Sequence, residues 1–226
     1  MGIRKTAGIL AIIAALGAAT IRVEASIPPS QAFDFAIRRG DATIGQHAVS
    51  FRRDGDTLHV EVAIDIAVSL LFMTVYRYEH ASHEVWRGGR LIALDSRTDD
   101  NGTAHSVRGR AVPEGFAVEG GEGPILAPAD IVPTSYWSPE TRRQSVLLDT
   151  QRGRLAAVSV TPQGRDRIAT ANGPVEAIRY RMDGDLRMTL WYTPAGEWVK
   201  IAFRARGEDV EYLRQDAAAG SVVSAR

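Results

Sequence analysis

The residues best suited to chemistry lie in the run Glu79-His80-Ala81-Ser82-His83-Glu84, where two histidines stand three residues apart beside carboxylates. On a helix this spacing would present a metal-binding face. The neighbouring residues alternate between apolar and polar types, which is typical of a strand, and in a strand His80 and His83 point to opposite sides of the sheet. We therefore predict exposed polar residues of a strand here, with no metal site and no cofactor.

Other acid and base candidates stand alone in the sequence. His47, His59 and His105 are isolated, and Asp95 and Asp149 each end an apolar run, where aspartate usually makes turn hydrogen bonds. The chain has no cysteine, which excludes thiolate catalysis and a lipidated cysteine, and it has none of the common nucleophile, phosphate or zinc motifs. The sequence predicts no enzyme. A hydrolase or lyase acting on cell-wall or exported polysaccharide is the alternative, because a fold can gather carboxylates that are distant in sequence.

The elements that must position these residues have a period of two. The clearest strand alternates apolar positions with polar ones, and its apolar residues are Leu58, Val60, Val62, Ile64, Ile66 and Val68. Toward the C-terminal end, turn glycines recur at steps of 9, 11, 12 and 11 residues, from Gly164 through Gly173, Gly184 and Gly196 to Gly207. The sequence predicts an all-β fold, an antiparallel up-and-down meander curled into an open barrel or β-spiral.

One short helix is expected near the middle of the chain, where Ser138 can cap and Pro139 can take the first helical position. We expect the sheet to curl around residues 135–141. Residues 120–133 are rich in glycine and proline and are predicted to form loops.

The start of the chain indicates export. Arg4 and Lys5 precede an uncharged apolar stretch, and Val23-Glu24-Ala25 then offers the small residues that a signal peptidase needs. We expect residues 1–25 to be a signal peptide, residues 26–214 to form one periplasmic domain without a spanning segment, and residues 215–226 to be a frayed tail. Lysine plus arginine and aspartate plus glutamate number 27 each, which argues against nucleic acid as a partner.

An apolar tip and a few aromatic residues are the binding candidates. The run Leu70-Leu71-Phe72-Met73 must turn without a glycine or proline, and it is either a plug over the open end of the sheet or a lip for an apolar ligand or membrane. The grouped aromatics are explained either by core packing or by ligand contact. The predicted ligand-binding residues are Leu70, Leu71, Phe72, Tyr136, Trp137 and Trp191.

Short motifs in a fixed order resemble a bacterial envelope family. Among them are Phe33-Asp34-Phe35, Glu84-Val85-Trp86, Thr134-Ser135-Tyr136-Trp137, Leu148-Asp149-Thr150 and Gly196-Glu197-Trp198-Val199-Lys200. In this order the chain is similar to the family called domain of unknown function 6134, akin to the group numbered 3108. The resemblance implies an exported β-rich domain without assigned activity. The layout is more distantly similar to the half-barrels of periplasmic lipoprotein carriers, which hold acyl chains.

These observations favour a non-enzymatic envelope module that binds a lipid or acyl-chain ligand, or the apolar segment of an envelope protein, inside the curl. An envelope scaffold that uses an exposed sheet edge is the remaining alternative.

Overall fold

A computed structural model describes residues 32–70, 73–171 and 173–215 of the chain. In this part the chain forms one 15-stranded sheet and one short 3-10 helix. The strands are β1 (Ala32–Arg39), β2 (Ala42–Asp54), β3 (Thr57–Leu70), β4 (Met73–Arg87), β5 (Arg90–Asp100), β6 (Thr103–Val112), β7 (Gly115–Gly120), β8 (Gly123–Ala127), β9 (Val132–Pro133), β10 (Val146–Leu148), β11 (Leu155–Thr170), β12 (Gly173–Gly184), β13 (Met188–Tyr192), β14 (Trp198–Ala205) and β15 (Glu208–Gln215).

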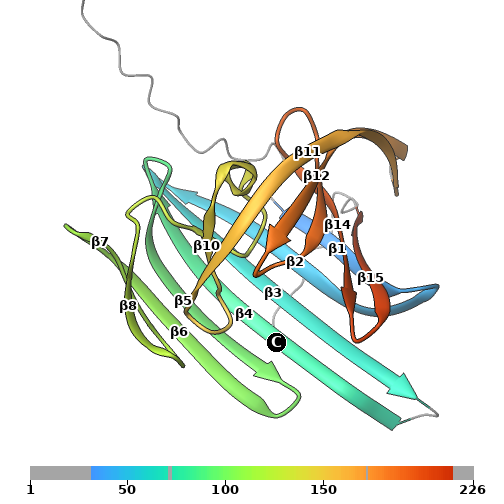
Figure 1. The fold of residues 1–226 in the computed structure, drawn as a ribbon, viewed down its shortest axis with the longest axis horizontal. Helices are drawn as coiled ribbons and strands as arrows, with labels where there is room; N and C mark the ends of the chain where they lie inside the picture. Colours follow the sequence, from blue (N-terminus) through green and yellow to red (C-terminus); the bar gives the residue numbers. More distant parts are fainter. Residues whose placement is uncertain (1–31, 71–72, 172, 216–226) are drawn as a thin grey trace, which may run out of the picture.

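The sheet consists of two meanders joined at their first and last strands. Strands β1 to β8 follow one another outward to one edge, β9 to β15 return from the other edge, and β15 pairs with β1 in the middle of the sheet. Among the described pairings only β9 with β10 is parallel. Figure 1 shows β10 and β11 folded over the concave side of the long strands β3 to β5. The predicted meander is confirmed, and its two edges stay unpaired with each other, so the barrel is open.

The strand alternation places one face of the sheet in a common core. Phe33, Phe35 and Ile37 of β1 are buried, as are Leu58 and Val60 of β3. Successive strand residues point to opposite faces, so the residues between them remain accessible to solvent. The curl therefore has an apolar inner face and a more polar outer face.

Trp137 is fully buried in the core inside the curl. It packs edge to face against Phe51 of β2 and Trp86 of β4, with ring centroids 5.4 and 5.3 Å away. The indole nitrogens of Trp86 and Trp137 both donate to Glu84 Oε2, at 2.8 and 2.9 Å. Burial raises the pKa of Glu84, and the two donors oppose that rise. This cluster attaches the middle of the chain to the N-terminal meander.

The predicted helix is present as the 3-10 helix η1 (Pro139–Arg143), with Ser138 as its N-cap. The loop predicted for residues 120–133 is partly wrong, because β8 and β9 lie there. Pro124 is tolerated in β8 because that strand lies at an edge of the sheet, where no further strand needs its missing N–H. Gly123 begins the strand at φ +99, a conformation that favours glycine.

The predicted apolar tip lies at the connection between β3 and β4. Leu70 pairs with Met73 in the hairpin register, while Leu71 and Phe72 lie outside the described residues. Beside the tip, Met73 is 68% exposed and Val75 is 49% exposed. The described flank of the tip therefore projects into solvent.

Candidate functional site

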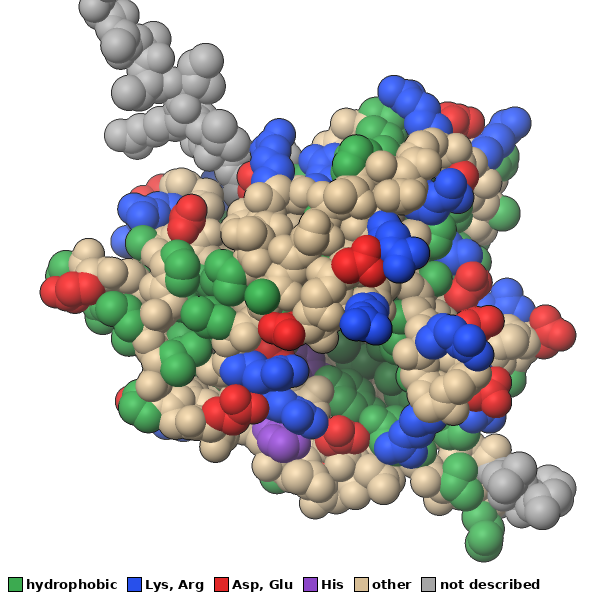
Figure 2. All heavy atoms as spheres, in the orientation of Figure 1, with side chains coloured by type: hydrophobic (Ala, Val, Ile, Leu, Met, Phe, Trp, Pro, Cys, Tyr) green, Lys and Arg blue, Asp and Glu red, His purple; other side chains and the backbone are tan. Residues whose placement is uncertain are grey.

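An open cavity of about 710 Å³ lies inside the curl. Figure 2 shows it as a hollow with hydrophobic walls and with basic and acidic side chains on its edge. One wall is the inner face of β3, and its apolar residues are Val62, Ile64, Ile66 and Val68. Val62 is buried and the other three are half-buried. The face of β3 that packs the core therefore continues outward as the wall of the cavity.

The facing wall comes from the C-terminal strands. Its apolar residues lie on β14, on β15, at the start of β13 and in the connection that precedes β13, and they are Leu186, Met188, Ile201, Phe203 and Val210. The volume falls within the range of roughly 300–1,000 Å³ that is usual for small-molecule pockets. An apolar ligand between these walls would lose contact with water on both sides.

Tyrosines add uncharged hydroxyl groups to the lining. Tyr78 of β4, Tyr136 of the segment before η1 and Tyr212 of β15 all border the cavity. Burial raises the pKa of each phenol, so all three are neutral at pH 7. Tyr136 has φ +59, an unusual conformation for a residue with a side chain, and its carbonyl accepts a 2.8 Å hydrogen bond from Tyr192 Oη. The chain holds Tyr136 in this conformation at the cavity.

A row of inward-facing residues crosses four strands where the core meets the cavity. His47 of β2 lies opposite Ile64, which lies opposite His80 of β4, which lies opposite Thr98 of β5. His80 Nδ1 is 2.7 Å from Thr98 Oγ1. Burial lowers the pKa of His80 to about 4, so this imidazole is neutral at pH 7.

His47 differs from the other polar residues of this row in its hydrogen bonding. It is 2% exposed, and neither ring nitrogen has a hydrogen-bond partner among the described residues. The rings of Phe35, Trp198 and Tyr212 surround it. Burial, and secondarily the nearby His80, lower its pKa to about 3. His47 is therefore a neutral imidazole in an apolar setting.

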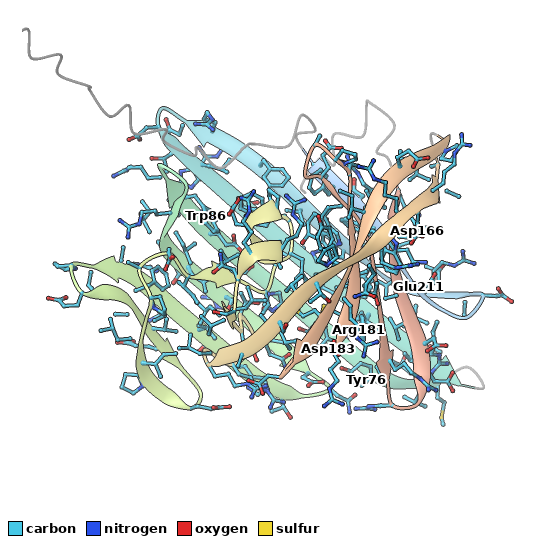
Figure 3. All side chains as sticks on the ribbon, turned by 45° about the horizontal axis from the view of Figure 1, so that its top comes forward. Tyr76, Trp86, Asp166, Arg181, Asp183 and Glu211 are labelled. Atoms are coloured by element: carbon cyan, nitrogen blue, oxygen red, sulfur yellow. The ribbon has the colours of Figure 1, made fainter. Side chains whose placement is uncertain are left out.

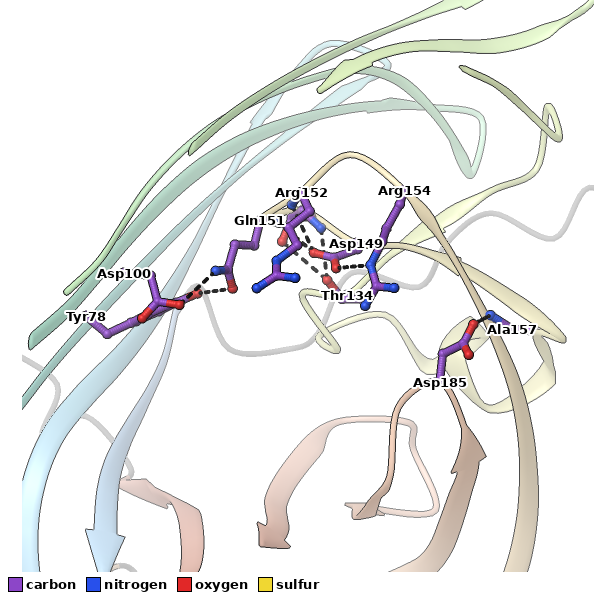
Figure 4. Close-up of polar contacts among 10 residues, drawn as sticks. Tyr78, Asp100, Thr134, Asp149, Gln151, Arg152, Arg154, Ala157 and Asp185 are labelled. Atoms are coloured by element: carbon purple, nitrogen blue, oxygen red, sulfur yellow. Dashed lines mark hydrogen bonds and ion pairs between the residues drawn. The ribbon is translucent and has the colours of Figure 1, made fainter. Parts of the chain in front are cut away.

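Hydrogen bonds link the turn after β10 to strands β4 and β5 on one side of the cavity opening, which we call the mouth (Figure 4). The side chain of Gln151, in the turn after β10, accepts a 3.4 Å bond from Tyr78 Oη and donates a 3.4 Å bond to Asp100. Asp100 also accepts a 2.9 Å bond from Tyr76 Oη. Burial and this bond raise the pKa of Tyr76 to about 12. Arg206, in the turn before β15, lies 4.6 Å from the Tyr76 ring centroid, so the two meanders meet across the mouth.

The structure brings together only part of the predicted ligand-binding set. Tyr136 borders the cavity. Trp137 is 0% exposed and lies within the core, so its ring cannot contact a ligand in the cavity. Leu70 is the last residue of β3, and Leu71 and Phe72 lie outside the described residues.

Trp191 lies on the opposite face of the sheet from the cavity. It packs with Ala177 and Val199 in a separate small cluster, and its indole nitrogen donates to Asp166 at 2.7 Å. Figure 3 labels Asp166 on β11, away from the interior residue Trp86. Trp191 was predicted to bind the ligand, but it does not line the cavity, because Leu190 and Tyr192 take the inward positions on either side of it.

Three of the isolated acid and base candidates, Asp149, Asp95 and His59, have partners that hold them in place. Asp149 pairs with Arg154 at 3.2 Å and accepts hydrogen bonds from the backbone of its own turn, and Asp95 pairs with Arg110. His83 faces the exterior, where its ring stacks on His59 with 3.0 Å between nitrogens. The prediction that this run consists of exposed polar residues is wrong for His80, Ser82 and Glu84, which alternate with it and are buried on the inner face. In the described ranges, no three histidine or acidic side chains are grouped in a way that could hold a metal ion.

Comparisons with known proteins identify the family of the chain and support its fold. The family model described as "Domain of unknown function (DUF6134)" matches residues 35–215. The crystal structure of a beta-barrel-like protein of domain of unknown function DUF1849 from Brucella abortus is similar, with a TM-score of 0.55 and 8% sequence identity over 81% of this chain and 93% of that one. At this identity the likeness concerns the fold alone. No curated protein matches the chain. The predicted family and barrel-like fold are confirmed.

Proposed function

The chain belongs to the DUF6134 family, and from the geometry of its cavity we propose that it is a non-enzymatic envelope module that binds an apolar or amphipathic ligand. The observation that carries the proposal is the continuation of the inner face of β3 beyond the core, as a half-buried apolar wall that the protein leaves uncovered. These apolar side chains of β3 do not pack into a filled core here. They line a hollow that is open to solvent.

The apolar area that an acyl chain would bury in the cavity is sufficient for substantial affinity. At about 25 cal/mol per Å², an acyl chain that buries roughly 300 Å² would gain on the order of 7 kcal/mol before the cost of ordering. The neutral tyrosines and histidines of the lining impose no buried charge on such a ligand. Both features support an apolar tail as the occupant.

The envelope location in this proposal rests on the sequence, through the basic and apolar leader of residues 1–25. In the described part of the chain, no helix has the length and apolar character needed to cross a bilayer. The non-enzymatic character is supported by the engagement of Asp149 with Arg154 and of His80 with Thr98, which leaves these groups in structural roles.

Replacement of Ile66 by glutamine is expected to weaken binding of the fluorescent fatty acid cis-parinaric acid at least about tenfold, because it removes apolar contact from the cavity wall. The protein is first freed of bound lipid, and affinity is measured by fluorescence titration. Ala67→Gln is the matched control, since Ala67 is the next residue of β3 and is exposed on the outer face.

The control variant is expected to bind as the wild type does. Absence of saturable binding by the wild type would refute the proposal. Equal affinity of Ile66→Gln and the wild type would place the ligand somewhere other than this cavity.

A further inference from the structure

Arginines from three separate elements border the cavity. Arg39 ends β1, Arg187 precedes β13, and Arg206 lies in the turn between β14 and β15. These positions come from separate parts of the sequence and border the same cavity, because β1 pairs with β15 and the β12–β13 connection also reaches the cavity. A guanidinium group carries its charge at every physiological pH and binds carboxylate or phosphate through paired hydrogen bonds.

Within the described residues none of these three arginines forms an ion pair. Arginines without a carboxylate partner also occur on the outer surface, where water solvates them. What distinguishes Arg39, Arg187 and Arg206 is their position beside an apolar hollow, where they can contact a ligand that also occupies the cavity.

The acidic residues of the lining do not cancel this charge. Asp149 is neutralised by Arg154, and Asp185 Oδ2 accepts a 2.8 Å hydrogen bond from the backbone N–H of Ala157 (Figure 4). Glu208 is exposed at the start of β15. Three arginines thus face two carboxylates that have no ion pair, and one of those carboxylates already accepts a backbone hydrogen bond.

We propose that the mouth binds the anionic head group, a carboxylate or phosphate oxyanion, of an amphiphile whose tail occupies the cavity. This inference rests on the proposed function and specifies its ligand. Arg39, Arg187 and Arg206 bind the oxyanion at the water-exposed end, while the apolar walls of β3, β14 and β15 cover the tail. The head group stays partly hydrated, so no bare charge is buried.

The test compares palmitate with methyl palmitate, which has the same tail without the charge. We expect the wild type to bind palmitate at least about tenfold more tightly, since charge-assisted hydrogen bonds are lost in the ester. We expect the triple variant Arg39→Gln, Arg187→Gln, Arg206→Gln to lose this preference. Affinities are measured by displacement of the neutral fluorophore N-phenyl-1-naphthylamine, whose own binding reports that the cavity is intact.

A matched control removes three charges elsewhere. Arg90→Gln, Arg165→Gln, Arg167→Gln alters exposed arginines that do not border the cavity, and it is expected to keep the preference for palmitate. Equal affinity of the wild type for acid and ester, or an unchanged preference in the mouth variant, would overturn the head-group inference alone. Failure of the neutral fluorophore and both lipids to bind would instead overturn the proposed function.

Competition with inorganic phosphate distinguishes a site for an amphiphile from a site for a small free anion. We expect millimolar phosphate to leave bound palmitate in place, because most of the affinity comes from the tail. Displacement of palmitate by phosphate at constant ionic strength would show a site for small anions and would contradict the proposal.

Discussion

Trp137→Ala is expected to lower the free energy of unfolding by about 3–5 kcal/mol, the usual cost of truncating a fully buried tryptophan. The ring fills the space between Phe51 and Trp86, and its nitrogen is one of two indole donors to the buried Glu84. Truncation leaves a void and removes a partner of that carboxyl group. Urea denaturation followed by circular dichroism measures the change.

Trp137→Phe separates packing from hydrogen bonding at this position. It keeps most of the ring and removes the donor, so we expect a loss smaller than that of the alanine variant. If the free energy of unfolding of Trp137→Ala lies within about 1 kcal/mol of the wild-type value, the ring does not join the middle of the chain to the N-terminal meander.

His47→Phe is expected to raise stability at pH 7 and to remove part of the loss of stability in acid. At pH 7 the gain is about 1–3 kcal/mol, because both ring nitrogens of His47 are buried without partners and phenylalanine has none to desolvate. The surrounding rings of Phe35, Trp198 and Tyr212 suit an aromatic replacement.

The acid effect follows from the lowered pKa of His47. Its pKa is about 3 in the folded protein and about 6.5 in the unfolded chain, so below pH 6.5 the unfolded chain binds a proton that the folded protein excludes. Stability is therefore lost as pH falls, by about 3 kcal/mol between pH 6.5 and 4 from this residue. His80 contributes in the same direction. Glu84 acts oppositely, because its raised pKa makes the folded state lose stability as pH rises above about 4.5.

Comparison between variants isolates the contribution of His47 to the pH dependence of stability, since His80 and Glu84 are present in all of them. His47→Gln is the control: it removes the titration and keeps a buried polar group, so we expect a flatter acid profile without the gain at pH 7. Stability is measured by urea denaturation from pH 4 to 7. An acid profile of His47→Phe parallel to that of the wild type would show that the folded protein does not lower the pKa of this imidazole, and would contradict the prediction.

Local patterns were sufficient to predict the strands that have a regular alternation of apolar and polar residues. The alternation from Leu58 to Val68 appears as β3, and glycines such as Gly55, at φ +58, stand in the tight turns between strands. The cap at Ser138 likewise appears at the start of η1. These features depend on neighbours within a few residues, so the sequence displays them directly. The strands at residues 120–133 were missed because an edge strand tolerates the glycine and proline that usually mark loops.

The site was harder to predict because it depends on the direction of each side chain and on distant pairings. Tyr136 and Trp137 are adjacent, yet one borders the cavity and the other fills the core. Trp191 faces away because a shift of one residue along a strand reverses the face. The arginines at the mouth had no signal in the sequence, since only the pairing of β1 with β15 brings Arg39 close to the β14–β15 turn.

The most direct test of the cavity's role uses nuclear Overhauser contacts between protonated palmitate and methyl groups of the otherwise deuterated protein. We expect contacts from acyl protons to the methyls of Ile64, Ile66 and Val68, and none to those of Ala63 and Ala67, which alternate with them on the outer face of β3. Contacts to the outer-face methyls, or to neither set under saturating palmitate, would contradict a ligand held between the two meanders.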